Sequence, residues 1–283
     1  MKVIYVGQNL LKNKKDMNYG GMIRKYYSQK ILSEKENLIF IEKYKDVLKF
    51  KENIIDQESF LWIHYPLQRK LSILTIFLSF FFQNKIILTI HDIPILQQKD
   101  LADTKYTYFK QFSIKFTEKI LFRIAKYIIL PAPGLKKNIS KRKNQTFFVM
   151  PPGISKQELN IAPACSFINK RKVALYFGSM KRSDSIFQLT KVFSKMDSWD
   201  LHLVGPLDNE QLHFANNIKY LGQVNHCDLP NILHNSDVIL IPYPKTEYFN
   251  LCMPIKLGYS LMSFKPIITT KLNGIQEYVN FVR

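Results

Sequence analysis

Short runs of apolar, β-branched residues alternate along the chain with longer segments whose apolar residues recur every three or four positions. The short runs predict strands and the longer segments predict helices. In the first half, this pattern predicts strands at residues 3–6, 60–64, 86–90, 127–130 and 147–150, and helices at 21–32, 67–82 and 106–126. A strand-then-helix order is typical of a parallel, doubly wound sheet.

The alternation stops at Met150-Pro-Pro-Gly-Ile154 and then starts again. Two prolines and a glycine in this position indicate an interdomain linker. Beyond it, the pattern predicts strands at 173–177, 201–204, 218–221, 238–241 and 266–269, and helices at 185–196, 229–233 and 254–262. The predicted fold class is therefore α/β, with two Rossmann-like domains at residues 1–150 and 151–283.

The composition excludes some classes of protein. With 46% hydrophobic residues among 283, the chain can bury a sizeable core, which argues against global disorder. Its three cysteines, Cys165, Cys227 and Cys252, are widely spaced and odd in number, which favours a reducing compartment over a disulfide framework. The apolar run after Lys2 is too short for a signal peptide. We therefore expect a cytoplasmic protein.

The formal net charge of +19 is distributed unevenly. Residues 1–150 hold 27 Lys and Arg against 12 Asp and Glu, whereas residues 151–283 hold 14 against 10. Such a field attracts phospholipid surfaces, nucleic acid or phosphorylated substrates, although a merely solvated basic surface is the alternative. The cations are scattered and form no reading motif, so no nucleic-acid partner is expected.

An apolar segment, LSILTIFLSFFF at residues 71–82, raises the question of a membrane. It is shorter than the roughly 20 residues that a spanning helix needs. Arg69, Lys70 and Lys85 flank it, which is typical of a helix lying on the lipid interface, and a buried core helix fits the composition equally well. The basic first half favours a peripheral position on the inner membrane surface.

Several motifs could bind phosphate. Lys256 falls in the first turn of a predicted helix, where a bound phosphate would offset its repulsion by the helix dipole; an exposed lysine is the alternative. Gly178 allows a tight turn after a strand and precedes Lys181 and Arg182, which suit a diphosphate. No Asp-x-Asp triplet, which could supply ligands to a metal, occurs in the sequence, and neither a metal nor a cofactor is expected.

The first half offers candidates for acid–base chemistry. His91 and Asp92 follow a predicted buried strand, where Asp92 could act as a base or His91 could bind a sugar hydroxyl. Asp92 could equally cap a turn. His64 occupies a similar strand end. Gly20 and Gly21 precede a helix and permit close approach of a ligand, but they form no G-x-G-x-x-G fingerprint, and a plain turn is the alternative.

Together these segments resemble the GT-B glycosyltransferases, in particular the large family-4-like group. Pro254-Ile-Lys-Leu257, Lys265-Pro-Ile-Ile-Thr-Thr270 and Asn273-Gly-Ile-Gln-Glu277 are similar to its donor-site signature. The resemblance implies that Lys256, with Lys181 or Arg182, holds the donor diphosphate. It places these further residues beside them: Gly178, Asn250, Leu257, Gly258 and Glu277.

The same resemblance extends to other parts of the chain. Pro151-Pro-Gly-Ile154 is similar to the interdomain linker of that group, and Gly20-Gly21 to its first-domain glycine loop. Lys256-Leu-Gly258 with Ile90-His-Asp-Ile-Pro94 is similar to a bacterial subgroup that includes glucosyltransferases of adhesin glycosylation and galactofuranosyltransferase-like enzymes of surface polysaccharides.

The sequence departs from the family pattern in two places. Where many members carry two glutamates eight positions apart, this chain has Leu251 and Tyr259; Glu247 and Asn250 are the nearby substitutes. The sequence ends at Arg283, so the second domain is expected to be truncated at its C-terminus.

The resemblance implies a hexosyltransferase that moves sugar from a nucleotide-diphosphate donor, with a UDP-sugar favoured, to a hydroxyl of a surface glycan, glycolipid or glycoprotein in polysaccharide biosynthesis. A lipid-linked acceptor would explain a membrane location. The alternative is a non-catalytic relative that binds nucleotide sugar or supports another transferase. A homo-oligomer stays open.

Overall fold

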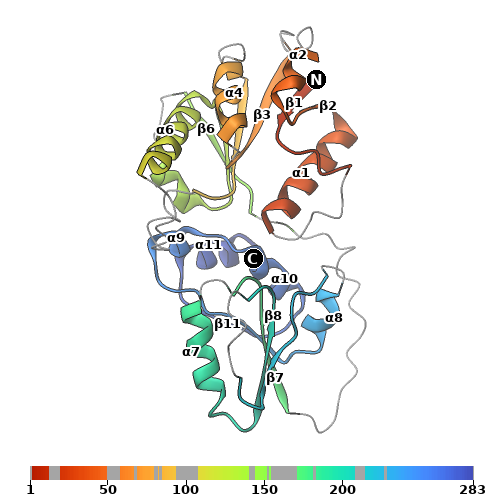
Figure 1. Ribbon diagram of the computed structural model, residues 1–283, viewed down its shortest axis with the longest axis vertical. Helices are drawn as coiled ribbons and strands as arrows, with labels where there is room; N and C mark the ends of the chain where they lie inside the picture. The colour runs from red at the N-terminus through yellow and green to blue at the C-terminus, as the bar shows by residue number, and fades with distance from the viewer. Residues whose placement is uncertain are drawn as a thin grey trace. The chain divides into compact units, whose positions relative to one another are not determined.

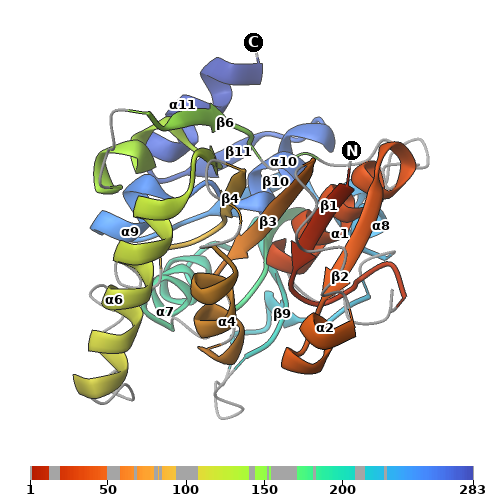
Figure 2. The same cartoon turned by 90° about the horizontal axis from the view of Figure 1, so that it is seen from above.

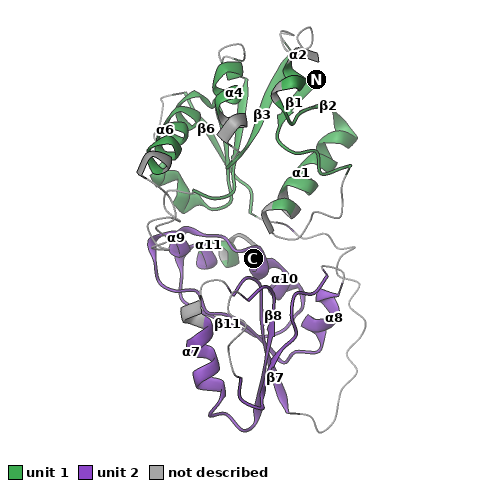
Figure 3. Cartoon of the chain, in the orientation of Figure 1, with its two compact units in different colours: residues 1–151, 277–283 green, residues 152–276 purple. Residues whose placement is uncertain are grey.

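The structure is a computed structural model and describes residues 2–12, 20–49, 58–66, 69–79, 82, 85–93, 108–139, 144–151, 153, 171–180, 183–207, 214–225 and 228–282. Its helices and strands are labelled in Figure 1. The chain divides into two compact units, shown in Figure 3: unit 1 holds Met1–Pro151 and Glu277–Arg283, and unit 2 holds Pro152–Gln276.

Unit 1 is built on a six-stranded sheet with the order β2-β1-β3-β4-β5-β6. Every neighbouring pair is parallel. The strands are β1 (Lys2–Val6), β2 (Asn37–Ile41), β3 (Ser59–Tyr65), β4 (Ile86–Ile90), β5 (Tyr127–Leu130) and β6 (Thr146–Val149). All five predicted strands are confirmed. The sequence analysis missed β2, because its short apolar run directly follows a long helix.

The helices of unit 1 are α1 (Gly20–Lys35), α2 (Tyr44–Lys49), α4 (Arg69–Ser79) and α6 (Tyr108–Ile124), with a 3₁₀ helix η2 (Pro133–Asn138) after β5. Parallel crossovers are right-handed, so α1, which leads from β1 outward to β2, covers the opposite face from α4 and α6. Helix α4 contacts both α2 and α6, and Figure 2 shows these three helices side by side.

Helix α4 corresponds to the apolar segment of the sequence. Leu74, Thr75 and Leu78 are buried on its inner side, so this side belongs to the core of unit 1. Ile73 and Phe77 are exposed on the outer side. Within the described ranges, no helix has the length and apolarity required to cross a bilayer.

Unit 2 carries a five-stranded sheet with the order β11-β10-β7-β8-β9, again parallel throughout. Its strands are β7 (Lys172–Phe177), β8 (Trp199–Val204), β9 (Ile218–Tyr220), β10 (Val238–Ile241) and β11 (Ile267–Thr269). Its helices are α7 (Ser183–Phe193), α8 (Leu229–His234), α9 (Glu247–Leu251) and α10 (Ile255–Met262), and the last helix, α11 (Asn273–Val282), begins in unit 2 and continues into unit 1.

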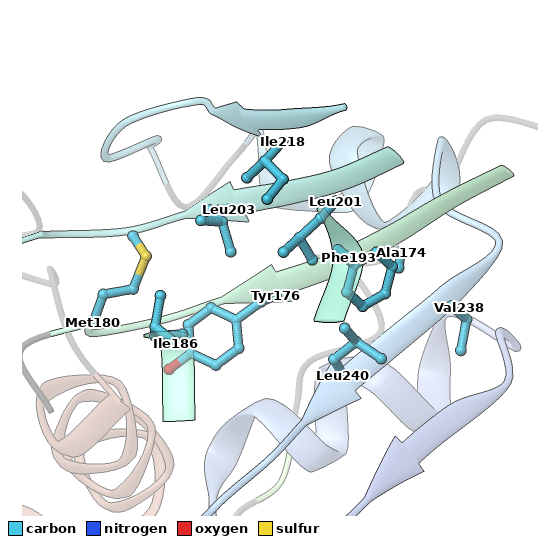
Figure 4. Packing of buried hydrophobic residues seen from close by; sticks show 10 residues of the cluster. All are labelled: Ala174, Tyr176, Met180, Ile186, Phe193, Leu201, Leu203, Ile218, Val238 and Leu240. Carbon is cyan, nitrogen blue, oxygen red and sulfur yellow. The ribbon is translucent and has the colours of Figure 1, made fainter. Parts of the chain in front are cut away.

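The second sheet is covered on both faces, as a parallel sheet requires. Ala174 and Tyr176 of β7 belong to the core cluster that contains Ile186 and Phe193 of α7 (Figure 4). Leu175 and Phe177 alternate with them and belong to a second cluster on the other face, which contains these residues of α8 and α10: Leu229, Leu233 and Tyr259. The α/β class with two parallel sheets is therefore confirmed.

Two helices of unit 2 were missed, and the extent of the second domain differs from the prediction. Helix α9 has five residues, too few for an apolar period, and is capped by Thr246, whose hydroxyl accepts from the Phe249 N–H. Helix α11 continues past Gln276, and Glu277–Arg283 belong to unit 1. There, the Glu277 carboxylate accepts a hydrogen bond from the Gly134 N–H at 3.3 Å.

Candidate functional site

A row of glycines ends three neighbouring strands of unit 2. Gly178, Gly205 and Gly222 follow β7, β8 and β9 with φ of +118°, +130° and +75°. The Gly178 N–H donates to the Val204 carbonyl and the Gly205 N–H donates to the Gly222 carbonyl, both at 2.8 Å. Glycine tolerates positive φ without strain, and it leaves no side chain above the strand ends. A ligand can therefore approach the backbone along this edge.

The side chain of Lys256 lies directly against this row. A methyl group added to Gly178 would lie 2.7 Å from Lys256 Nζ and 3.0 Å from its Cε. Gly178 and Lys256 are 78 positions apart, and the sequence analysis placed both in the donor site. The fold brings these two predicted residues into contact at the carboxyl end of a central strand, where open α/β sheets bind their ligands.

Aromatic rings surround the Lys256 ammonium. Nζ lies 4.5 Å from the ring centroid of Tyr176 and 5.0 Å from that of Tyr243. It also donates to the Tyr176 hydroxyl at 3.5 Å, and this hydroxyl in turn donates to the Ser179 carbonyl. The aromatic faces stabilise a cation that is only 9% exposed, because a buried ammonium without compensation is costly.

Helix α10 presents Lys256 from its first turn. Pro254 is the N-cap, and no side chain caps the helix there. The next two residues of the predicted motif, Leu257 and Gly258, are buried within α10. The Ser260 hydroxyl bonds back to the Lys256 carbonyl at 2.7 Å. The positive end of the α10 dipole and the Lys256 ammonium therefore lie together, an arrangement that favours an anion.

The remaining predicted donor residues have different surroundings. The Asn250 carboxamide accepts a hydrogen bond from the Asn273 N–H at 3.0 Å, at the start of α11. Glu277 belongs to unit 1, as described above. Lys181 and Arg182 lie outside the described residues. The roles of all four in donor binding stay predictions.

In unit 1, His64 and His91 lie side by side at the ends of β3 and β4. His64 Nδ1 is 2.7 Å from His91 Nε2, so one ring donates and the other accepts. Trp62 stacks on His64 with ring centroids 5.7 Å apart and donates from its indole nitrogen to the Thr89 hydroxyl. Both imidazoles are buried, and the fold therefore joins two residues that the sequence analysis treated separately.

Burial is the main cause of the low pKa of His64, and a nearby positive charge adds to it. Burial, and then the charge of Lys25, lowers the pKa of His64 from its ordinary 6.5 to about 3. Burial also lowers the pKa of Lys25, while the charge of Asp92 opposes that shift. His64 is therefore neutral near pH 7, and Lys25, Asp92 and the histidine pair form one electrostatic cluster, named here the histidine cluster.

The two glycines of the first domain lie in a helix and not in a loop before it. Gly20 and Gly21 are the first residues of α1, which begins one position earlier than predicted. The expected glycine loop is therefore corrected to the first turn of a helix at these two positions.

Five residues of these sites were missed by the sequence analysis: Lys25, Tyr176, Gly205, Gly222 and Tyr243. Gly205, Gly222 and Tyr243 follow the ends of β8, β9 and β10, so the rule that singled out Gly178 would have found them. Tyr176 lies inside an apolar strand, and no sequence signal distinguishes it from an ordinary core residue. Lys25 follows Arg24 in a Lys-rich chain, and nothing in the sequence indicates its burial.

The architecture of both units defines the GT-B class of fold, two α/β units with parallel sheets, and comparisons with known proteins agree. Residues 171–281 match the profile of the family described as Glycosyl transferases group 1. This matched segment includes the glycine row and Lys256. Among curated proteins, no sequence matches the chain.

Several solved structures share the fold along most of the chain. Sucrose-phosphate synthase (tll1590) from Thermosynechococcus elongatus aligns with a TM-score of 0.71 and 14% identity, covering 98% of this chain and 83% of its own. Anabaena Alr3699/HepE in complex with UDP and glucose aligns with a TM-score of 0.56 and 14% identity, covering 98% and 82%. An α-glucosyltransferase in complex with UDP and a 13-mer DNA aligns with a TM-score of 0.56 and 8% identity, covering 97% and 81%.

Proposed function

We propose that this chain is a glycosyltransferase that moves a hexose from a nucleotide-diphosphate sugar, with UDP as the favoured nucleotide, to an acceptor hydroxyl. The observation that carries the proposal is the contact between Lys256 and Gly178 at the start of α10. The match of residues 171–281 to Glycosyl transferases group 1 supports it, as does the UDP bound by two proteins of the same fold.

In this proposal, unit 2 binds the donor. The glycine row accommodates the nucleotide sugar close to the backbone, and the Lys256 ammonium with the first turn of α10 holds the diphosphate. As the bond between the sugar and the diphosphate breaks, negative charge grows on the leaving group. A fixed ammonium and a helix dipole stabilise that charge without a metal ion. Lys181 and Arg182 are proposed to add to the same positive field.

Unit 1 is proposed to bind the acceptor. The acceptor hydroxyl forms the new bond to the sugar carbon and loses its proton to Asp92 or to His91. His64 holds His91 through the 2.7 Å contact between their rings. Because His64 stays neutral near pH 7, it can serve as a fixed hydrogen-bond partner. The acceptor class that we propose is a surface glycan, glycolipid or glycoprotein, handled at the inner surface of a membrane.

One observation favours a second candidate function. Tyr259 of α10 stands where many related enzymes carry a glutamate, and it is buried in the core. Leu251, eight positions earlier, is likewise no carboxylate. Two carboxylates that could accept a hydrogen bond from a ribose hydroxyl are therefore replaced, one by a phenol and the other by an apolar side chain. A protein that binds nucleotide sugar without transferring it, or that supports a partner transferase, fits this replacement.

Titration with UDP and with UDP-glucose, by calorimetry and with hydrolysis assayed in parallel, tests both candidates. The Lys256→Met substitution keeps most of the side-chain volume and removes the charge. We expect it to weaken UDP binding about 10- to 100-fold, the value of a charge-assisted hydrogen bond. The matched control is Lys191→Ala, which removes an exposed lysine from the last turn of α7, away from the strand ends.

Each outcome has a clear reading. Unchanged UDP affinity in the Lys256→Met protein would refute the role of Lys256 in phosphate binding. UDP-glucose bound without hydrolysis, and without transfer to any offered glycan acceptor, would favour the non-catalytic candidate. A protein that binds neither UDP nor UDP-glucose would refute both candidates.

A further inference from the structure

The outer side of α6 combines aromatic and cationic residues. Its exposed residues recur every three or four positions, which places them along one stripe of the helix. This stripe, named here the outer stripe, consists of Phe112, Lys115, Phe116, Lys119 and Arg123. The two phenylalanine rings stack with centroids 6.4 Å apart. Neighbouring exposed aromatic residues rimmed by cations mark an interaction surface, whereas singly exposed apolar residues need no explanation.

The fold fixes this side of α6 outward. Leu121 and Phe122 are buried on the inner side. Glu118, also buried, accepts a hydrogen bond from the Tyr65 hydroxyl of β3 at 3.0 Å. This bond and the buried apolar residues hold α6 in one rotation about its axis. The outer stripe is therefore exposed because the packing of the inner side fixes the orientation of α6.

Helix α4 extends the apolar part of this surface. Helices α4 and α6 are in contact and cover the same face of the sheet, so their outer sides face the same way. Ile73 and Phe77 of α4, with Phe112 and Phe116 of α6, are between 56% and 65% exposed. Four large apolar side chains on two adjacent helices form a surface that can enter a lipid interface.

The charge of these helices decides which partner fits. The sequence of α4 contains no Asp or Glu, and the single acidic residue of α6, Glu118, is buried. Residues 1–150 carry a net charge of +15. Exposed aromatic residues beside cations, without exposed acidic residues, match the chemistry of an anionic phospholipid surface: cations bind head groups and aromatic rings enter the interface.

We infer that the outer stripe of α6, with Ile73 and Phe77 of α4, is the surface by which this protein docks on an anionic membrane. The inference rests on the proposed function at a membrane surface, and it names the residues responsible. It also gives the described part of the apolar segment, residues 73–79, a definite role: its inner side packs in the core and its outer side faces lipid.

Sedimentation with sucrose-loaded vesicles tests the inference. Vesicles of phosphatidylcholine with about 30 mol% phosphatidylglycerol, which have a negative surface potential like that of a cytoplasmic leaflet, are compared with vesicles of pure phosphatidylcholine. We expect the wild-type protein to prefer the anionic vesicles. Phe112→Ser with Phe116→Ser should lower the partition coefficient about tenfold or more. Lys115→Gln with Lys119→Gln should lower the partition coefficient about fivefold for each lysine removed. This reduction should be smaller at high salt, because salt screens the attraction between the lysines and the head groups.

Matched controls come from unit 2. Phe187 of α7 is 60% exposed, close to the value for Phe112, and Lys191 lies on the same helix. Phe187→Ser and Lys191→Gln should leave vesicle binding unchanged. Every variant is also examined by circular dichroism and titrated with UDP, because an unchanged spectrum shows that unit 1 is folded and retained UDP affinity shows that unit 2 is folded. Vesicle binding without UDP binding would refute the proposed donor and leave the docking surface supported.

Three results would overturn the inference. One is wild-type protein that does not sediment with anionic vesicles. Another is vesicle binding that the α6 variants do not reduce more than the α7 controls do. A wild-type dimer in sedimentation velocity that Phe112→Ser with Phe116→Ser disperses, while vesicle binding persists, would assign this surface to a second copy of the chain and would also overturn it.

Discussion

The two units end their central strands in opposite ways. In unit 1, the strand ends carry titratable side chains. His64 and His91 are in contact, the charge of Lys25 acts on His64, and the charge of Asp92 acts on Lys25. In unit 2, the strand ends carry glycines, and the charge arrives from the side on Lys256 of α10. The sheets are alike, so the difference lies in what each strand end presents to a ligand.

This difference teaches how one architecture can divide two tasks. A cluster of imidazoles and a carboxylate can hold and move a proton, because its charges respond to one another. A backbone edge without side chains, with a fixed ammonium beside it, can hold a bulky anion. The comparison therefore predicts that substitutions in unit 1 affect turnover, and that substitutions in unit 2 affect donor affinity.

The largest expected effect concerns turnover. Asp92→Asn and His91→Ala each remove a group proposed to take the acceptor proton. We expect the more important of the two to lower kcat about 10²- to 10⁴-fold, the usual contribution of a general base. UDP affinity should stay unchanged. His234→Ala, at the end of α8 in unit 2, is the control. Full turnover in both unit 1 variants would remove the proposed acceptor role of the histidine cluster.

The next effect concerns stability against pH. The pKa of His64 falls from 6.5 to about 3 on folding, so the unfolded chain binds a proton below pH 6.5 that the folded chain does not. The free energy of unfolding therefore decreases as the pH falls from 6.5 toward 3, by about 1.4 kcal/mol per unit, and does not respond to this group above pH 6.5.

Urea unfolding at pH 7.0 and pH 5.0 measures that effect. We expect the His64→Asn protein to lose about 2 kcal/mol less than the wild type over this range. His202, whose pKa is lowered by partial burial, acts with the same sign in unit 2, and His202→Asn is the comparison. An equal pH dependence in the wild type and the His64→Asn protein would contradict the assignment of a neutral, buried His64.

The smallest effect concerns glycine substitutions, which can act through backbone strain or by displacing Lys256. Gly178→Ala and Gly222→Ala both place a methyl group at positive φ, which costs about 1–2 kcal/mol of unfolding free energy. Only Gly178→Ala also brings a methyl group 2.7 Å from Lys256 Nζ. The lysine end is flexible and will move, so we expect UDP affinity to fall about tenfold in that variant alone.

Gly153→Ala serves as the baseline, since nothing lies within 4 Å of the added methyl group. Urea unfolding of the three variants measures the free energy of unfolding, and UDP titration measures the UDP affinity. If Gly222→Ala weakened UDP binding as much as Gly178→Ala, distortion of the strand ends, and not displacement of Lys256, would account for the loss.

Much of the fold could be predicted because periodicity is a local property. The central strands β4, β5 and β10 were predicted with their observed bounds, since short apolar β-branched runs are seldom anything else. The missed elements are short or ambiguous. Strand β2 follows a helix almost at once, and α9 depends on a single capping hydroxyl from Thr246.

The site could be predicted only in part. Strand ends and helix starts pointed to Gly178, Lys256, His64 and His91, because ligands collect there in α/β sheets. Their pairing could not be predicted, since it depends on strand order: β3 lies beside β4, which brings His64 to His91. The burial of Lys25 and the rings around Lys256 depend on tertiary packing, of which the sequence carries no local sign.

The close approach of Gly205 to Gly178 has a consequence for protein engineering. A methyl group on Gly205 would overlap the Gly178 carbonyl oxygen, an atom of the main chain that cannot turn aside as a side chain can. Any residue other than glycine after β8 would therefore require the backbone after β7 to move. A designer who wants a side chain at this position will need to redesign both loops together.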